Sequence, residues 1–413
     1  QYTHLLDLNW THTGSGNFVN QMTAAYTRTF GNDICVDCQV PAITINDGTA
    51  GPGNGFFGLF KQNNYEWKDV AALTKGHQSF KFGANVARHH DDELFTGTTL
   101  RPTFTFTNAL AFAADNPYFE GNIGINPQTG QQGGVNVDFA YRSTDAGYFI
   151  QDDAKLRPNF TLNLGVRSDI FTGPTERFDR LNNMILQGGG TFQQEIANAK
   201  MGHVAALWHT RLDNFAPRFG LAWDPTRKGK MSVRGGYGIF YDRPAQQFYT
   251  GDRTNLPLDA TVNASIFTPP VVPVYGLGAS GNSPYNFPIV PGIVGGLNSK
   301  GGLISGPAGQ EVTDPHLQTQ YGENWSFSLQ YEVFNNWVVE AAYLGSMGHH
   351  LYSAYDVNRF DGNLIQDANV LTRLNTSFGG LDYGQANFNS SYNGGTVAIR
   401  NRGFNKGLNF QAA

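Results

Sequence analysis

The residues from His89 to Glu93 read His-His-Asp-Asp-Glu and bring imidazole and carboxylate groups to the end of a strand-like segment. Imidazole nitrogens and carboxylate oxygens are common ligands of divalent metals, and carboxylates also attract cationic ligands. The run therefore has two interpretations: a ligand-binding group at the outer end of a strand, or a strand end that meets only solvent. The solvated strand end is the commoner role of such a run.

A second pair of histidines, His349 and His350, stands at a similar place at the outer end of a later strand-like segment. A joint site would require the fold to bring this pair and the earlier run together, and the sequence does not place the two groups in space. The candidate ligand-facing loop residues are the histidines of both groups and two of the acids: His89, His90, Asp91, Asp92, His349 and His350.

Two cysteines, Cys35 and Cys38, form the sequence Cys-Val-Asp-Cys. A soluble oxidoreductase places such a pair between a strand and a helix, and no helical pattern follows here. A metal site is disfavoured because no second pair of ligands accompanies the first. Disulfides form and persist in oxidising compartments outside the cytoplasm. We therefore expect a local disulfide in an exposed loop, with unpaired thiols as the alternative.

The motifs of common enzyme classes are missing from the sequence. Catalysis by side chains needs a nucleophile with a base, or paired carboxylates. The sequence has no Gly-x-Ser-x-Gly elbow, no His-Glu-x-x-His and no phosphate-binding loop. The net charge is -5, and no basic stripe suggests a nucleic-acid partner. We therefore expect no enzymatic activity, no cofactor and no nucleic acid.

The composition differs from that of an ordinary soluble protein. Charged residues make up 15% of the chain, where about 25% is usual. Aromatic residues reach 13%, and 50 of the 413 residues are glycine, yet the mean hydropathy is -0.35. No apolar run approaches the roughly 20 residues of a membrane-spanning helix. If the chain lies in a membrane, it must therefore do so as a closed β-barrel, which satisfies all backbone hydrogen bonds in lipid.

Apolar residues recur with a period of two in many segments. One example places four apolar side chains at alternate positions: Trp325, Phe327, Leu329 and Tyr331. The positions between them are polar: Ser326, Ser328, Gln330 and Glu332. Because residues i and i+2 of a strand share a face, this alternation predicts strands with one apolar and one polar face.

These segments come in pairs that are joined by short turns containing Gly, Pro or Asn. We predict six hairpins, hence twelve strands, from residues 2–12 with 18–30, 65–74 with 78–90, 144–155 with 160–171, 215–223 with 231–242, 322–333 with 337–345, and 391–401 with 407–413. Long segments rich in Gly, Pro, Asn and Thr separate the hairpins: 31–64, 91–143, 172–214, 243–321 and 346–390. Short turns on one side and long loops on the other are typical of an outer-membrane barrel. A soluble β-sandwich or propeller is the alternative.

Three arginines, Arg167, Arg218 and Arg234, fall on the polar faces of predicted strands. They would line the lumen of a barrel. We favour the interpretation that they pair with Asp or Glu on neighbouring strands and so hold the wall together, because a polar lumen must satisfy its own charges.

Several hairpins carry motifs that resemble those of a known family. Residues 147–153 read Gly-Tyr-Phe-Ile-Gln-Asp-Asp, and residues 156–167 read Leu-Arg-Pro-Asn-Phe-Thr-Leu-Asn-Leu-Gly-Val-Arg. Together they resemble a hairpin of the TonB-dependent outer-membrane receptors, in which Tyr-x-Gln-Asp precedes Pro-x-Leu-Thr-Leu-x-x-Gly-x-Arg. Residues 214–225 and 233–243 are similar to the next hairpin of the Oar-like branch of that family, and residues 8–12 and 342–351 also fit this branch.

The resemblance implies an all-β fold: an antiparallel transmembrane β-barrel of 22 strands with long extracellular loops, of which this chain supplies about twelve strands. Residues 1–413 would then form part of a single barrel domain. The signal peptide, the plug and the carboxypeptidase-regulatory-like domain of the family are absent from the sequence, so we expect a fragment.

The resemblance also implies a function. The expected location is the outer membrane, and the expected partners are outer-membrane lipid, an unidentified extracellular ligand and the TonB complex, which acts through the plug. The implied activity is TonB-dependent uptake of the ligand. Two alternatives stay open: a passive porin-like channel, and a surface adhesion or assembly protein that binds partners through its loops.

Overall fold

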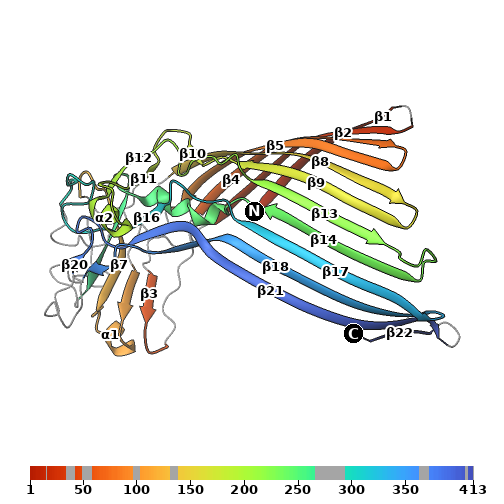
Figure 1. Ribbon diagram of the computed structural model, residues 1–413. Coiled ribbons are helices and arrows are strands. Elements are labelled where there is room, and N and C mark those ends of the chain that lie inside the picture. Colours follow the sequence, from red (N-terminus) through yellow and green to blue (C-terminus); the bar gives the residue numbers. More distant parts are fainter. Residues whose placement is uncertain are drawn as a thin grey trace.

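The computed structural model describes residues 1–14, 16–33, 42–48, 58–95, 103–130, 138–265, 294–361, 372–404 and 408–412, and its main element is one large sheet (Figure 1). The sheet has fourteen strands among these residues, two of which, β10 (Thr175–Glu176) and β16 (Gln310–Thr313), are short additions. The other twelve are β1 (Tyr2–Gly14), β2 (Phe18–Asp33), β4 (Gly58–Lys75), β5 (Gln78–Phe95), β8 (Asp138–Arg157), β9 (Phe160–Phe171), β13 (Phe215–Trp223), β14 (Met231–Tyr241), β17 (Tyr321–Phe334), β18 (Trp337–Asp356), β21 (Leu381–Phe404) and β22 (Leu408–Ala412). Each pairs in antiparallel register with the next in this order, which confirms the six predicted hairpins.

Several strands reach farther toward the long segments than the alternation predicts. β4 begins at Gly58 instead of residue 65, β8 at Asp138 instead of 144, and β21 at Leu381 instead of 391. At β21 the reason is a partner that is distant in sequence. β16 runs parallel to its first residues, from Gln310 beside Leu381 to Thr313 beside Gly384, and supplies backbone hydrogen bonds that no local pattern reveals.

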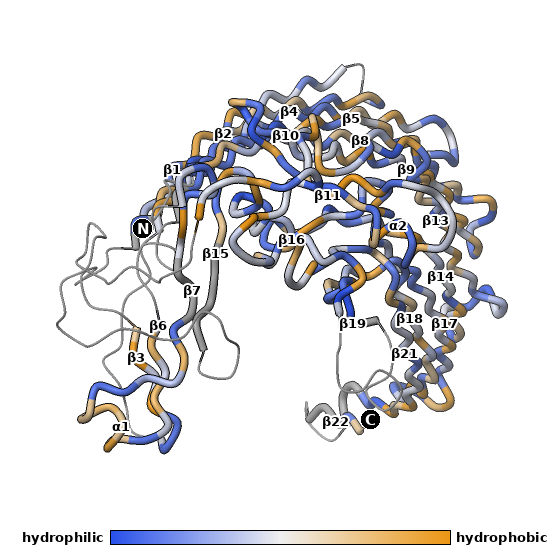
Figure 2. The backbone as a smooth tube through the Cα atoms, turned by 90° about the vertical axis from the view of Figure 1, so that its left-hand side faces the viewer, coloured by the Kyte–Doolittle hydropathy of each residue, from blue (hydrophilic) through white to orange (hydrophobic). Residues whose placement is uncertain are grey.

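The sheet curves into an open arc when it is seen from the end where the long segments gather (Figure 2). β1 lies at one end of the arc and β22 at the other, and within the described residues β1 pairs only with β2 and β22 only with β21. The short strand β16 lies inside the arc. The concave side of the sheet is therefore covered at this end, whereas the turns lie at the opposite end (Figure 1).

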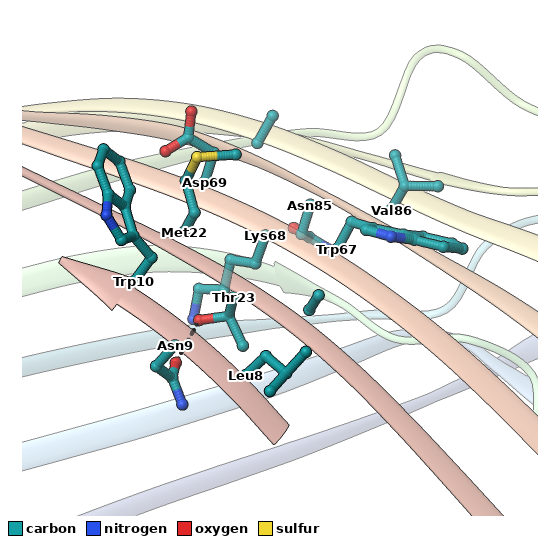
Figure 3. A pocket seen from close by; sticks show the side chains of 12 residues that line it. Leu8, Asn9, Trp10, Met22, Thr23, Trp67, Lys68, Asp69, Asn85 and Val86 are labelled. Atoms are coloured by element: carbon teal, nitrogen blue, oxygen red, sulfur yellow. Dashed lines mark hydrogen bonds between the residues drawn. The ribbon is translucent and has the colours of Figure 1, made fainter. Parts of the chain in front are cut away.

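The face of the sheet that points away from these segments is apolar and exposed. Trp10 is 55% exposed, Trp67 53%, Ile150 54% and Phe327 52%, and cross-strand register places all four on one face. Near β1 this face carries a groove of about 490 Å³ (Figure 3). Its outward-facing side chains include Leu8, Trp10, Met22, Trp67, Ala84 and Val86. Such an area of exposed apolar surface requires a cover.

The long segments contain short elements of their own. A four-stranded sheet is formed by β3 (Ala42–Ile45), β6 (Thr103–Phe106), β7 (Phe119–Ile125) and β15 (Ala260–Ser265). Two further pairs are β11 (Asn182–Ile185) with β12 (Lys200–His203), and β19 (Phe360–Asp361) with β20 (Thr372–Arg373). The helical elements are α1 (Ala109–Ala113), α2 (Phe192–Asn198), η1 (Gln246–Phe248) and η2 (Thr250–Thr254). Among the described residues, neither α-helix has the length and hydropathy to cross a bilayer.

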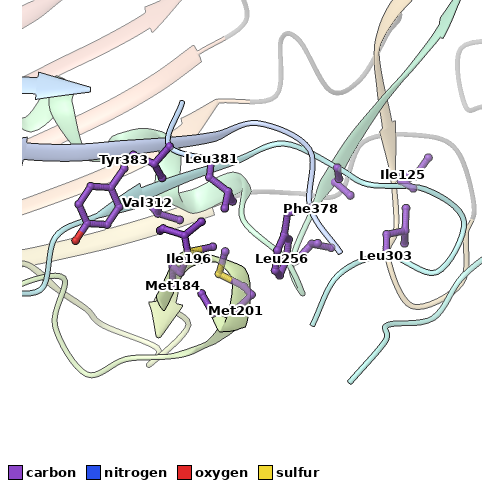
Figure 4. Packing of buried hydrophobic residues seen from close by; sticks show 14 residues of the cluster. Ile125, Met184, Ile196, Met201, Leu256, Leu303, Val312, Phe378, Leu381 and Tyr383 are labelled. Carbon is purple, nitrogen blue, oxygen red and sulfur yellow. The ribbon is translucent and has the colours of Figure 1, made fainter. Parts of the chain in front are cut away.

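The largest hydrophobic core lies among these segments and not against the middle of the sheet (Figure 4). Phe378, Leu256 and Ile196 are completely buried and come from segments that are far apart in the sequence. We name the packed unit the loop assembly and define it by these described ranges: 172–214, 243–260, 294–320, 357–361 and 372–383. The segments that separate the hairpins are thus a folded unit, held by its own core.

Candidate functional site

The mouth of the arc is crossed by residues 243–259, which we name the crossing segment and which contain η1 and η2. On one side it is bound to β4 and β5. Gln62 donates from Nε2 to Gln246 Oε1 at 3.1 Å, and Gln246 donates from Nε2 to Glu93 Oε1 at 2.7 Å. Arg253 Nη1 lies 3.4 Å from Glu93 Oε2. Glu93 is only 7% exposed, so this amide and this guanidinium supply the partners that a buried carboxylate requires.

On the other side the crossing segment contacts β18 and β16. The hydroxyl of Tyr352 donates to the carbonyl oxygen of Phe248 at 2.7 Å, and the two rings stack with their centroids 4.3 Å apart. Thr313 Oγ1 donates to Asp252 Oδ2 at 3.2 Å. β8, β9, β13, β14 and β17 lie between β5 and β18 in the sheet. The segment therefore reaches from one wall of the arc to the other across the concave side.

The centre of the crossing segment is a buried acidic site. Asp252 is 1% exposed, and burial, together with the nearby carboxylate of Glu311, raises its pKa well above the usual range, although the Thr313 hydroxyl opposes this shift. A Cβ at position 251 would overlap with the Glu311 carboxylate, so Gly251 lets this flexible side chain lie close to the segment. A neutral Asp252 needs no buried counter-charge, so the segment can stay packed around it.

The predicted run from His89 is divided by the alternation of β5. His89, Asp91 and Glu93 point to the concave side, whereas His90 and Asp92 point to the opposite face. His89 Nδ1 lies 2.8 Å from Asn64 Oδ1, and His89 Nε2 lies 3.1 Å from Asp145 Oδ2. The run thus does not form one group of side chains, because three of its residues face the concave side and two face the opposite side.

The remaining candidates lie apart from one another. On the outward face, the ring of His90 lies 5.4 Å from that of Tyr65, and Asp92 accepts from Arg142 at 2.7 Å. On β18, which five strands separate from β5, His349 stacks on Tyr321 at 4.8 Å with its Nε2 3.4 Å from Glu323 Oε1. His350 meets the same ring edge-on. The structure does not bring the two histidine groups together. No three His, Cys, Asp or Glu side chains could hold a metal ion in the described part of the chain.

The predicted disulfide cannot be placed. Cys35 and Cys38 lie outside the described residues, so the pairing stays a prediction.

The three wall arginines have different partners. Arg167 forms an ion pair with Asp169 on its own strand at 2.6 Å and donates to Asn85 at 2.9 Å. Arg218 lies over the ring of Phe240 at 4.5 Å, and Arg234 donates to Ser232 at 3.2 Å. The predicted pairing with acids on neighbouring strands is therefore wrong for all three, because Asp169 is two residues along the same strand and the other two use an aromatic ring and a hydroxyl.

Sequence reasoning missed the residues of the crossing segment. Arg243, which lies 3.5 Å from Asp145, and Gln246, Asp252 and Arg253 belong to a long segment without apolar periodicity. The one available signal is local charge: two arginines and two aspartates occur between residues 242 and 253 of a weakly charged chain.

Comparison with known families decides the assignment. A family described as "Outer membrane beta barrel domain" matches residues 1–413, the entire chain. The chain belongs to the outer-membrane β-barrel domain family. The protein is therefore a component of the outer membrane.

Solved structures with a similar fold are transporters and receptors of the outer membrane. One is the outer membrane transporter YddB from Escherichia coli, with 13% identity and a TM-score of 0.48; the match covers 97% of this chain and 39% of that one. Another is the siderophore receptor PirA from Acinetobacter baumannii, with 9% identity and a TM-score of 0.47; the match covers 97% of this chain and 42% of that one. The FrpB iron transporter from Neisseria meningitidis is similar at 11% identity (TM-score 0.45, 97% and 42%). The chain thus spans about two fifths of the length of these structures. A search of curated proteins gave no match.

Proposed function

We propose that this barrel is a receptor and transporter that takes up an extracellular ligand through its lumen, with energy supplied by the TonB complex acting on a plug. The hairpins of residues 147–167 and 214–243 support TonB dependence by their resemblance to receptors of that family. The observation that carries the receptor role is the loop assembly, a folded unit with its own core over the mouth of the arc. Loops that a rigid scaffold positions in this way are the usual place of ligand recognition.

In this proposal the candidate residues have different roles. His89 and Asp91 face the mouth beneath the crossing segment, so they meet a ligand only after it has passed the loop assembly. His349 lies on the outward face of β18, beside Tyr321 and seven residues before the strand ends at Asp356, so it does not face the mouth. The extracellular ligand itself is unidentified, and the lipid of the outer membrane covers the outward face.

A passive porin-like channel is the second candidate, and one observation favours it. The crossing segment is anchored to both walls by Glu93 and Tyr352 and narrows the concave side, as a constriction loop does in a channel that needs no plug. A surface adhesion protein, the third interpretation of the sequence, would use the same loop assembly without any transport.

Two measurements on the full-length protein separate these functions. In planar bilayers with potassium chloride, a plugged transporter shows no steady conductance, whereas a passive channel conducts. A purified periplasmic domain of TonB is then tested for binding to the same preparation. Binding without conductance supports our proposal, and steady conductance without TonB binding would contradict it. If the protein neither conducts nor binds TonB, the result favours the surface adhesion protein.

A further inference from the structure

The lipid-facing side of the sheet carries a cluster of cations near its loop end. Cross-strand register aligns Arg28 of β2, Asn63 of β4, His90 of β5 and Arg142 of β8 in one row. Arg88 lies in the next row toward the turns, beside Tyr65 and Thr144. Lys61 lies in the next row toward the loops, and we name Arg28, Lys61, Arg88 and Arg142 the cation cluster. With strands about 4.8 Å apart, Arg28 and Arg142 are separated by roughly 14 Å.

The charge of the cation cluster is poorly compensated. Asp92 is the one carboxylate in these three rows of the described sheet, and Arg142 binds it at 2.7 Å. Arg88 donates to the neutral hydroxyl of Thr144 at 2.8 Å. Within the described residues, Arg28 and Lys61 form no ion pair, and the buried Nε of Arg28 has no acceptor. Both side chains are only half-buried, so their cations are accessible to an anion from outside the chain.

An aromatic belt borders the cation cluster on the side of the apolar band of the sheet. The rings of Tyr26 and Tyr65 are 5.0 Å apart, and Tyr65 continues to Trp67 at 6.5 Å. Tyrosine and tryptophan are enriched at the level of the lipid headgroups. Arg28, Lys61 and Arg142 lie on the loop side of this belt and Arg88 lies level with Tyr65, at the height where the headgroups of the outer leaflet begin.

The groove of Figure 3 lies directly on the other side of the belt. Its walls include Trp67 and Val86, and Val86 precedes Arg88 by two residues on the same face of β5, a separation of about 7 Å. From the turns toward the loops, the surface therefore carries an apolar groove, then aromatic rings, then cations. A phosphorylated lipid has the matching order: an acyl chain, then the region where the chain joins the headgroup, then the phosphates.

We infer that the cation cluster and the groove together form a binding site for the phosphorylated glycolipid of the outer leaflet. The arginines and Lys61 bind the headgroup phosphates, and one acyl chain lies in the groove between Trp10 and Trp67. Arg28 and Arg142 are far enough apart to contact two phosphates of one headgroup. This site is independent of ligand uptake and does not rest on the proposed transport function.

The test uses the full-length protein, purified in detergent and stripped of lipid, with purified lipopolysaccharide as the probe. We expect the triple variant Arg28→Gln, Lys61→Gln, Arg88→Gln to bind the lipid at least about tenfold more weakly, since each cation near a charged headgroup contributes several-fold. The matched control removes three exposed cations elsewhere: Lys81→Gln, Lys228→Gln and Arg234→Gln. It should bind like the wild type. Equal affinity of the two triple variants for lipopolysaccharide would contradict the proposed site.

A second measurement needs no variant and so does not depend on folding. Wild-type protein is offered lipopolysaccharide from which the headgroup phosphates have been removed, and binding should weaken by a similar factor. Inorganic phosphate at millimolar concentration should compete poorly, because it cannot occupy the groove. Unchanged binding of the dephosphorylated lipid, or full competition by inorganic phosphate, would contradict a lipid site.

Discussion

Buried asparagines hold the loop assembly together at the residue scale. Asn358 donates from Nδ2 to three backbone carbonyl oxygens, those of Asn375, Phe378 and Gly379. Asn375 in turn donates to the carbonyl oxygens of Ile196 and Ala199. Irregular backbone leaves many polar groups without partners, and an amide side chain can satisfy several at once. The abundance of asparagine in the long segments was visible in the sequence, but its partners were not, because they are up to 179 residues away.

Replacement of Asn358 by alanine should loosen this assembly. The variant loses the donors for three buried carbonyls, and each unsatisfied group costs about 1–3 kcal/mol. We expect faster limited proteolysis between residues 357 and 383, with the barrel strands still protected. Asn198→Ala, on the exposed surface of α2, is the control, and the protease should cut this variant at the wild-type rate. Equal rates for both variants would show that Asn358 is not structural.

Asp259 makes the stability of the loop assembly dependent on pH. It is fully buried, and burial raises its pKa from an ordinary value of 3.8 to about 7, although the backbone N–H of Ala260 opposes the shift. A raised pKa in the fold stabilises the folded state below pH 4, and this contribution is lost as the pH rises through 7. The loss is roughly 4 kcal/mol at most, from about 1.4 kcal/mol for each pKa unit.

Thermal unfolding at pH 5 and pH 8 measures this effect. The wild type should unfold at a lower temperature at pH 8, and Asp259→Asn should reduce that difference because its side chain stays neutral. Asp179→Asn, at an exposed position, serves as the control. A difference that persists unchanged in Asp259→Asn would assign the pH dependence to other groups.

At the scale of elements, the strands could be predicted and the crossing segment could not. An apolar–polar alternation such as that of residues 325–332 is a local property, so it identifies each hairpin and the face that each side chain occupies. The crossing segment is fixed by single contacts to β4, β5, β16 and β18, which no periodicity encodes. The same alternation divides the run from His89 between two faces, but the continuation of β5 to Phe95 depends on its pairing with β4 and β8 and was not predicted.

The two faces of β8 should differ sharply in their tolerance of charge. Ile150 lies on the outward apolar face and is 54% exposed, whereas the adjacent Gln151 points to the concave side and donates to Asp153 at 3.0 Å. Ile150→Arg should destabilise the protein folded in lipid vesicles by about 2–4 kcal/mol. Gln151→Arg should have a small effect, because the new cation faces Asp153 and water. Similar unfolding free energies for the two variants would be inconsistent with a lipid-facing surface at Ile150.

The crossing segment should control permeability if its anchors hold it in place. Replacing Arg243 and Arg253 by alanine removes the ion pairs to Asp145 and Glu93. We expect a larger or noisier conductance of the full-length protein in planar bilayers, and Arg234→Ala, on the same concave face, should leave it unchanged. Identical conductance of the double variant and the wild type would mean that other contacts hold the segment.

At the scale of the whole molecule, the sheet is a curved wall with an exposed apolar face on one side and a covered concave side on the other. All long segments emerge from one end and all short turns from the other, an asymmetry that composition and turn spacing already indicated. The folding of the long segments into the loop assembly was not predictable, because its core is built from residues more than a hundred positions apart, such as Ile196 and Phe378. The central claim is therefore one of orientation: the loop assembly outside the cell and the turns in the periplasm.

Labelling of intact cells by a membrane-impermeant maleimide tests this orientation most directly. In the full-length protein with Cys35 and Cys38 changed to serine, a single cysteine replaces either Phe192, exposed on α2, or Lys228, exposed in the turn between β13 and β14. Our account predicts that Phe192→Cys is labelled in intact cells and that Lys228→Cys is labelled only after the outer membrane has been permeabilised. Labelling of Lys228→Cys in intact cells while Phe192→Cys stays protected would contradict it.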